Sequence, residues 1–294
     1  MTRLNICNLE RAVLGLFFLA VLSAGWTTTA SAALALVTDL QGKATIADGG
    51  KSREATILAE LDAGAQVQLN PGATLVVLYL DAGDEYVFKG PAQVVFKSGQ
   101  PEVVKGARPE KRIASMVAGR KDIRIKPVAM AQGAMVMRSA RPAARIRLLS
   151  LSATRTLEIQ PEFRWQEAQP GIKYQFEIND DIGRTFYEAQ VATTSFKLPS
   201  NVQLKEGVSY TWEVSARLAD GRKYSSAGDF SMASAALRAQ ADALRPAASA
   251  PLSSRVAYAA WLDQMELKDE ARKYWRALAT ERPEDVRLKA LAAE

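Results

Sequence analysis

The chain has 294 residues, 48% of them hydrophobic, and its 38 Lys and Arg against 32 Asp and Glu give a net charge of +6. It contains no histidine and one cysteine, Cys7. Without histidine there is no Ser-His-Asp or Cys-His nucleophile, and one cysteine cannot supply the usual zinc ligand sets. The length suits two or three small domains.

The first 32 residues have the pattern of a secretory signal peptide. Arg3 and Arg11 flank a short polar start, and the apolar run 12–25 that follows is shorter than the ~20 residues that a membrane-spanning helix needs. The run ends in threonines and in Ala-Ser-Ala at 30–32, so we expect 1–32 to be cleaved off. The alternative is an uncleaved inner-membrane anchor. In both cases the rest of the chain is expected outside the cytoplasm, in the periplasm.

Cys7 precedes the apolar run, whereas the cysteine of a lipoprotein follows such a run. A lipid anchor is therefore not expected. Cleavage would leave a mature chain without cysteine, which must be stabilised by apolar cores and not by disulfides.

Positive charge is concentrated in residues 105–147, where twelve basic residues against two acidic ones give +10. The first part of this segment is a candidate for anion binding. Since export argues against nucleic acid, the candidate ligands are an anionic cell-wall polymer, a membrane surface or an acidic protein face. The interpretation favoured over specific binding is a solvated linker kept soluble by its charge. The candidate anion-binding residues are Lys105, Arg108, Lys111, Arg112, Arg120, Lys121, Arg124 and Lys126.

Residues 33–126 are expected to form an all-β domain whose C-terminal part is basic. Apolar residues alternate at Val67 and Leu69 and again at Leu75 and Val77, which is the signal of half-buried strands. Glycines stand between these runs, where turns with positive φ favour them.

The spacing of glycine and aliphatic residues in this domain resembles the FecR-type periplasmic domain over about 70 residues. The resemblance implies a regulatory or signalling protein of the cell envelope, with this domain as a sensor surface. Many members also have a cytoplasmic regulatory segment. Here too few residues precede the apolar run to form such a segment, so direct binding to a sigma factor is not expected. The residues that carry the resemblance are Leu40-Gln41-Gly42-Lys43-Ala44, Leu61-Asp62-Ala63-Gly64, Val67, Leu69, Gly72-Ala73, Leu75, Val77, Tyr86, Phe88 and Gly90-Pro91-Ala92.

A linker rich in alanine and methionine is expected at 127–144, followed by a β-sandwich at 145–232. Aromatic residues alternate in three runs, around Trp165, Phe176 and Trp212, which predicts a sandwich core and about seven strands. The pattern Leu204, Gly207, Tyr210, Trp212, Val214, with Trp165 earlier, resembles the tyrosine-corner region of a fibronectin type III domain. The resemblance implies a module that positions its neighbours or presents loops.

Residues 233–294 change to the helical period. Ser254 is expected to cap a helix with Tyr258, Trp261, Leu262 and Met265 on one face. A second helix after Lys268 carries Ala271, Tyr274, Trp275 and Leu278, and a third, after Pro283, carries Val286, Leu288 and Leu291.

The spacing of Ala259, Leu262, Ala271, Trp275 and Pro283 is similar to one tetratricopeptide repeat with its following helix. A single repeat does not stand alone, so the hairpin should dock on the sandwich or on a partner. The alternative is a helical cap without a recognition role.

Few residues are candidates for chemistry. The carboxylates Asp81, Asp84 and Glu85 flank Gly83 and are expected to be solvated turn residues. Asp180-Asp181 suits a turn better than a calcium loop, which needs six or more oxygens. We expect no catalytic, cofactor-binding or metal-binding residue.

The expected protein is mainly β: a FecR-like domain, a fibronectin-like sandwich and a helical hairpin. The expected function is non-catalytic, a signalling or scaffold component of the cell envelope with a protein partner. The alternative is a protein that binds peptidoglycan or another anionic glycan. A third possibility, a carbohydrate-active enzyme using carboxylates alone, requires two acids converging in a cleft. The sequence does not identify the ligand, the partner, the oligomeric state or a transmitted signal.

Overall fold

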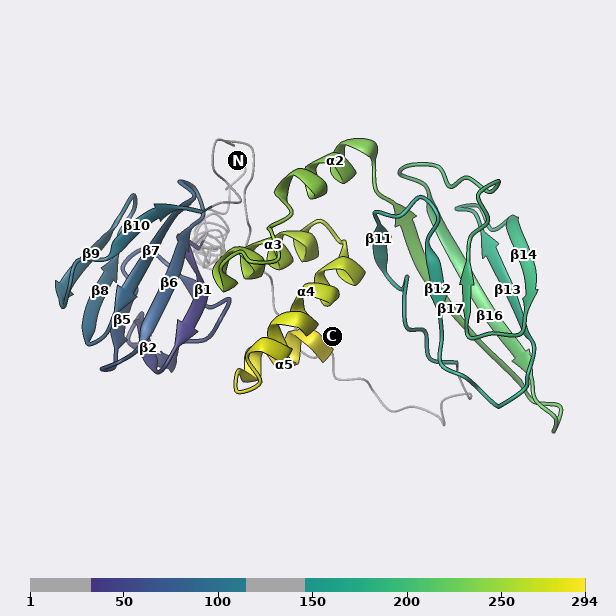
Figure 1. Ribbon diagram of the computed structural model, residues 1–294, viewed down its shortest axis with the longest axis horizontal. Helices are drawn as coiled ribbons and strands as arrows, with labels where there is room; N and C mark the ends of the chain where they lie inside the picture. The colour runs from purple at the N-terminus through teal and green to yellow at the C-terminus, as the bar shows by residue number, and fades with distance from the viewer. Residues whose placement is uncertain (1–32, 115–145, 294) are drawn as a thin grey trace, which may run out of the picture. The chain divides into compact units, whose positions relative to one another are not determined.

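The computed structural model describes residues 33–114 and 146–293 (Figure 1). The expected signal peptide and linker, and four of the candidate anion-binding residues (Arg120, Lys121, Arg124, Lys126), lie outside this part. All described residues fall in one compact unit that begins at Ala33. The expectation of a mainly β protein with a small C-terminal helical part is confirmed.

Two five-stranded antiparallel sheets make up residues 33–114, called here the N-terminal β unit. Their strand orders are β10-β7-β6-β1-β4 and β3-β2-β5-β8-β9. The strands are β1 (Ala35–Gln41), β2 (Ala44–Asp48), β3 (Lys51–Glu54), β4 (Glu60–Leu61), β5 (Gln66–Leu69), β6 (Thr74–Tyr79), β7 (Asp84–Lys89), β8 (Ala92–Phe96), β9 (Pro101–Lys105) and β10 (Glu110–Ile113).

The core of the N-terminal β unit contains the side chains that the alternation predicted. Val67 and Leu69 of β5 and Leu75 and Val77 of β6 are all buried, joined by a group of aromatic rings. Gly83 has a φ of 69° in the turn between β6 and β7, a conformation that glycine adopts without strain.

The prediction that Glu85 is a solvated turn carboxylate is wrong. Glu85 lies on β7 and is only 4% exposed. Its Oε2 lies 2.6 Å from Nε of Arg112 on β10, with which Glu85 is paired in register. A cation 27 residues further along the chain therefore compensates the buried charge.

Seven strands form the sandwich of residues 146–232, as expected. One sheet has the order β11-β17-β16-β13-β14, and the other pairs β12 with β15. The strands are β11 (Thr154–Thr156), β12 (Glu162–Arg164), β13 (Tyr174–Asn179), β14 (Thr185–Val191), β15 (Ser195–Lys197), β16 (Ser209–Arg217) and β17 (Lys223–Met232).

Aromatic rings fill the sandwich core. Phe163, Trp165, Phe176 and Trp212 are each at most 1% exposed, and their rings contact one another in edge-on, stacked and tilted arrangements. The hydroxyl of Tyr210 accepts a hydrogen bond from the Lys205 N–H at 3.0 Å, the upstream backbone contact of a tyrosine corner.

The helical tail consists of α2 (Ala235–Leu244), α3 (Leu252–Gln264), α4 (Lys268–Glu281) and α5 (Val286–Ala293). Ser234 caps α2 through its side chain. Among the described residues, no helix combines the length and apolarity needed to cross a membrane.

Three details of the tail differ from the expectation. α3 starts at Leu252 after Pro251, so Ser254 lies inside the first turn and is not its cap. α3 is also buried around most of its circumference and not along one stripe, since Val256 and Ala260 are buried as well. Finally, Val286 is 80% exposed.

The apolar surface of α3 is covered by this chain itself. Leu36, Leu58 and Leu78 of the N-terminal β unit belong to the same buried cluster as Trp261 and Leu262 of α3. Polar contacts accompany this packing, because Arg112 donates to the Ser253 Oγ at 3.3 Å. The helical hairpin is thus docked within the chain.

Asp39 of β1 faces Arg282 at the end of α4 and provides a pH-dependent test of the contact between the N-terminal β unit and the helical tail. Burial raises the pKa of Asp39 above its usual value, although Arg282 at 3.8 Å acts in the opposite direction. A raised folded-state pKa means that the stabilisation is present when Asp39 is protonated and is lost as the pH rises through that pKa. We expect Asp39→Asn to increase the free energy of unfolding at pH 7, with a smaller gain at acidic pH. Urea unfolding of the wild type and Asp39→Asn between pH 3 and pH 8 measures this gain in the free energy of unfolding. A gain that is independent of pH would contradict the prediction.

Candidate binding site beside helix alpha4

The loop before β11 attaches the sandwich to the start of α4. The Leu151 N–H donates to Asp269 Oδ2 at 2.7 Å, and the Leu151 carbonyl accepts from the buried indole N–H of Trp212 at 2.6 Å. Leu151 has a φ of 53°, an uncommon conformation for a leucine. One residue thus links the aromatic core of the sandwich to the helical tail.

Strand β11 caps α4 from outside the helix. The Thr154 Oγ1 accepts a hydrogen bond from the Lys268 N–H at 3.0 Å and lies 3.1 Å from the Glu266 carbonyl, to which it donates. The Arg155 N–H also donates to the Glu266 carbonyl, at 2.7 Å. Helix α4 has no capping side chain at its own N-cap, Leu267, so the sandwich satisfies a helix N–H that would otherwise lack a partner.

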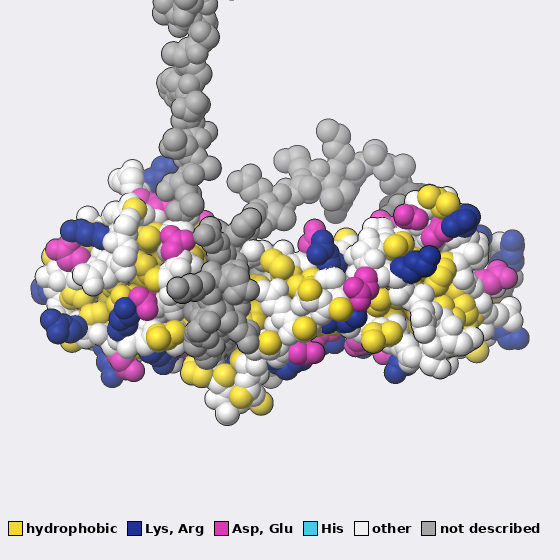
Figure 2. Space-filling view, turned by 90° about the horizontal axis from the view of Figure 1, so that it is seen from above, with side chains coloured by type: hydrophobic (Ala, Val, Ile, Leu, Met, Phe, Trp, Pro, Cys, Tyr) yellow, Lys and Arg dark blue, Asp and Glu magenta, His cyan; other side chains and the backbone are white. Residues whose placement is uncertain are grey.

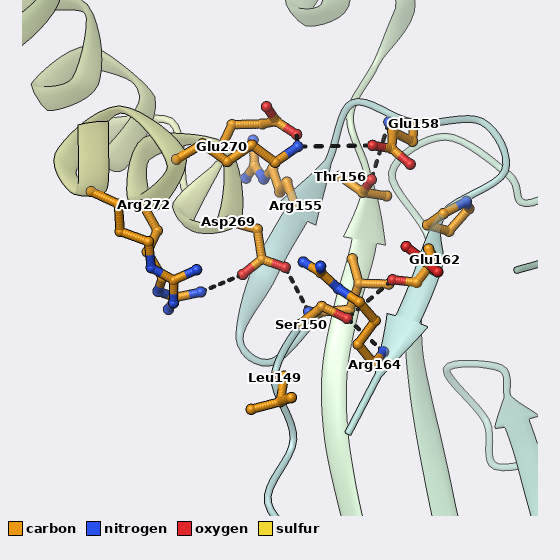
Figure 3. A pocket seen from close by; sticks show the side chains of 14 residues that line it. Leu149, Ser150, Arg155, Thr156, Glu158, Glu162, Arg164, Asp269, Glu270 and Arg272 are labelled. Carbon is orange, nitrogen blue, oxygen red and sulfur yellow. Dashed lines mark hydrogen bonds and ion pairs between the residues drawn. The ribbon is translucent and has the colours of Figure 1, made fainter. Parts of the chain in front are cut away.

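A polar cavity of ≈ 220 Å³ lies where these segments meet (Figure 3). Strands β11 and β12 with their loops line one side, and α4 lines the other. The lining includes five basic and four acidic side chains. The basic ones are Arg155, Arg164, Arg272, Lys273 and Arg276, and the acidic ones are Glu158, Glu162, Asp269 and Glu270.

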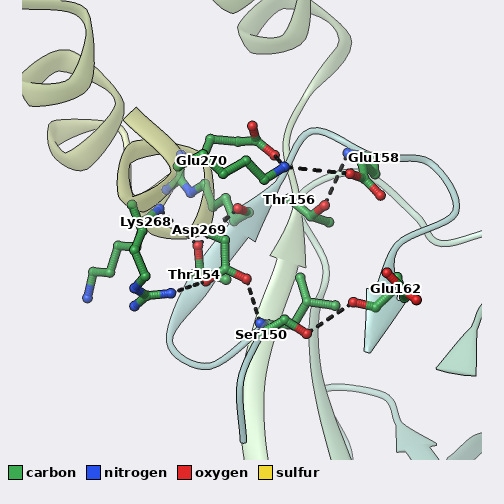
Figure 4. Close-up of polar contacts among 12 residues, drawn as sticks. Ser150, Thr154, Thr156, Glu158, Glu162, Lys268, Asp269 and Glu270 are labelled. Carbon is green, nitrogen blue, oxygen red and sulfur yellow. Dashed lines mark hydrogen bonds and ion pairs between the residues drawn. The ribbon is translucent and has the colours of Figure 1, made fainter. Parts of the chain in front are cut away.

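Ion pairs between lining residues neutralise part of the charge in the cavity (Figure 4). Arg272 contacts Asp269 at 2.7 Å, and Lys273 contacts Glu270 at 2.7 Å and Glu158 at 3.9 Å. Among the described residues, no ion pair is formed by the guanidinium groups of Arg164 and Arg276. A small anionic group entering the cavity can therefore pair with two cations that have no carboxylate of their own.

The two hydroxyls in the cavity bond backbone groups, and the Thr156 Oγ1 accepts from the Glu158 N–H at 3.1 Å. The Ser150 Oγ donates to the Glu162 carbonyl at 3.0 Å and accepts from the Arg164 N–H at 2.9 Å. The Ser150 hydroxyl is therefore engaged with backbone groups. No group of three or more His, Cys, Asp or Glu residues able to hold a metal is found within the described ranges.

Four of the eight predicted anion-binding residues lie in the described part of the chain, on β9, β10 and the loop between them. Lys105 and Arg108 are exposed, whereas Lys111 pairs with Asp84 at 2.7 Å and Arg112 with Glu85. The hydrogen bond to Asp84 raises the pKa of Lys111. On the face seen in Figure 2, Lys and Arg side chains are scattered among acidic and apolar ones. Two of the four described candidates are thus already neutralised.

Sequence reasoning missed the cavity. Its residues come from 149–164 and 269–276, two segments more than a hundred positions apart, and none belongs to a recognisable motif. The one available signal was the pair of arginines Arg272 and Arg276, one helical turn apart on the polar face of α4.

Comparison with known proteins identifies no family. No model of a known protein family matches the chain, and no curated protein matches its sequence. Among solved structures, the crystal structure of CopC from Methylosinus trichosporium OB3b is similar to part of it, with 18% identity and a TM-score of 0.24. The match covers 30% of this chain and 94% of that one.

Proposed function

We propose that this protein is a non-catalytic interaction scaffold of the cell envelope, exported by its N-terminal signal peptide. The observation that carries the proposal is the placement of α3 and α4, which contact both β regions through buried side chains and backbone hydrogen bonds. These contacts hold two β surfaces on one helical support. Such an arrangement suits the presentation of binding surfaces to a partner.

The resemblances to FecR-type and fibronectin type III domains support the same proposal, because both kinds of module act through their surfaces. The helical tail contributes as an internal support, with its α3 face already covered by the chain. The surfaces that remain for partner binding are the exposed sheets of the two β regions and the outer side of α4 and α5.

In-cell crosslinking tests the proposal. Tagged full-length protein is crosslinked in intact cells and the captured proteins are identified by mass spectrometry, for the wild type and for the double variant Thr154→Val, Asp269→Asn. Thr154→Val removes the acceptor of the Lys268 N–H, and Asp269→Asn replaces the charged acceptor of the Leu151 N–H with a neutral, weaker one. We expect a reproducible set of envelope proteins with the wild type, and a several-fold lower yield with the double variant at equal protein level.

Thr280→Val is the matched control, because Thr280 is exposed on the same helix and its hydroxyl donates only to the Arg276 carbonyl of that helix, at 2.9 Å. It should capture the same set as the wild type. Equal capture by the double variant would refute a role for the junction in function.

A second function, binding of an anionic cell-wall polymer, is favoured by the unpaired Arg164 and Arg276 of the cavity. In the same experiment it predicts recovery of wall material in place of a defined set of proteins. Sedimentation with purified sacculi should then weaken in the double variant Arg164→Gln, Arg276→Gln and remain unchanged in Arg222→Gln, an arginine at a distant turn paired with Asp220.

A further inference from the structure

Strand β14 is a free edge of the sandwich. In the described part of the chain its seven residues pair with β13 alone, so the outer row of backbone N–H and C=O groups has no strand partner (Figure 1). Edge strands are commonly protected by lysine, proline or short length. Residues Thr185–Val191 contain no lysine and no proline, and although the register shifts between Ile178 and Asn179, Tyr187–Val191 pair regularly with β13. The edge is therefore open to another strand.

A row of carboxylates crosses the sheet at this edge. Glu188 of β14 is directly opposite Glu177 of β13, and Glu177 is directly opposite Glu213 of β16. Like charges in directly opposed positions destabilise a sheet. No ion pair compensates any of the three within the described ranges, and the Thr185 hydroxyl, which donates to Glu177 at 3.0 Å, brings no charge. The row ends at the open edge with Glu188.

The opposite side of β14 is apolar. Tyr187, Ala189 and Val191 alternate with the exposed Glu188 and Gln190 and are half-buried. Tyr187 and Val191 pack against the sandwich core. A strand added beside β14 would therefore place every second side chain next to this apolar border and the others next to the carboxylate row.

We propose that the free edge of β14 docks an extended segment of a partner protein in which basic residues alternate with apolar ones. Backbone hydrogen bonds to β14 supply affinity, as in other cases of strand addition. A lysine or arginine beside Glu188 extends the row with the opposite charge, and the apolar residues cover Tyr187 and Val191. This partner chemistry rests on the proposed scaffold function, to which it adds a docking surface separate from the junction with α4.

The charge argues for this occupant over two others. A second copy of the chain, pairing β14 with β14, would bring a second acidic row to the same edge. A divalent cation would need a coordinating set, and among the described residues no group of acidic side chains has the geometry to hold a metal. A cationic strand neutralises the carboxylate row without adding a second acidic row and without needing a metal-coordinating set.

Fluorescence anisotropy with a labelled, capped ten-residue peptide of alternating arginine and valine tests the docking on the full-length protein. We expect saturable binding that weakens by about fivefold in Glu188→Gln and again in Glu177→Gln, for ~1 kcal/mol per opposed charge pair. Glu167→Gln, an exposed glutamate in the loop after β12, is the matched control and should bind as the wild type does.

A second peptide separates strand addition from simple charge attraction. It has the same side chains but methyl groups on alternate backbone nitrogens, which remove its ability to pair with β14. Loss of binding by the methylated peptide supports the proposal, and equal binding overturns it, as does equal affinity of Glu188→Gln and the wild type. Displacement of the peptide by millimolar calcium, or dimerisation of the free protein that Glu188→Gln strengthens, would overturn the choice of occupant. Because the junction is untouched, these outcomes are independent of the crosslinking result.

Discussion

Replacing Trp212 with alanine is expected to destabilise the sandwich by about 3–5 kcal/mol, the cost of removing a large aromatic side chain from a packed core. Trp212 is fully buried and its ring lies 5.2 Å from that of Phe163 and 5.9 Å from that of Phe176. Its neighbours come from different strands and cannot all move in to fill the space. Chemical denaturation followed by circular dichroism measures the loss.

The conservative change Trp212→Phe separates packing from the hydrogen bond. It keeps a ring in the core but removes the N–H that Leu151 accepts at 2.6 Å, leaving a buried carbonyl without its donor at a cost of about 1–3 kcal/mol. Because the Leu151 N–H is bound to Asp269, we also expect the loop 150–155 to exchange its amide hydrogens faster.

Trp165→Phe is the matched control. Trp165 is almost equally buried and neighbours Trp212 at 6.2 Å, but among the described residues its indole N–H has no hydrogen-bond partner. The same substitution there removes an unsatisfied donor, so it should cost less and leave exchange in the loop unchanged. Equal effects of the two substitutions would show that the Trp212 hydrogen bond contributes nothing beyond packing.

The sequence predicted those parts of the fold that depend on local pattern. Tyr210, Trp212 and Val214 alternate because one face of β16 is buried, and a period of two shows this directly. The turns of the N-terminal β unit were predicted from glycines between strand-like runs, and Gly64, Gly72 and Gly83 all have positive φ.

What the sequence did not predict depends on contacts between distant segments. α3 was expected to have one apolar stripe, because nothing near Trp261 in sequence indicates that Leu36 and Leu58 cover another of its sides. Glu85 was placed in solvent because its neighbour Gly83 marks a turn, while its partner Arg112 is on a different strand. The cavity beside α4 has the same origin, since Arg164 and Arg276 meet only through the tertiary fold.

Replacing Arg112 with alanine is expected to destabilise the N-terminal β unit by about 3–5 kcal/mol, because it leaves a buried carboxylate without its cation. The Glu85 side chain is 5% exposed, and its remaining contact is the Thr38 hydroxyl at 3.4 Å. Lys111→Ala is the control on the same strand. Lys111 pairs with Asp84 at the surface, where such a pair contributes at most ~1 kcal/mol.

The reciprocal change separates the two charges of this pair. Glu85→Ala leaves Arg112 with a side chain that is 36% exposed and still within reach of Ser253, so the guanidinium can be hydrated and the cost should be smaller. The double variant Glu85→Met, Arg112→Met should recover most of the stability lost in Arg112→Ala, since apolar side chains of similar volume replace a buried pair at little cost. Urea unfolding of the wild type, the two single variants and the double variant measures these differences in the free energy of unfolding. Equal losses in both single variants, with no recovery in the double variant, would mean that packing of the arginine stem against α3 stabilises this region and that the charge of Glu85 does not require Arg112.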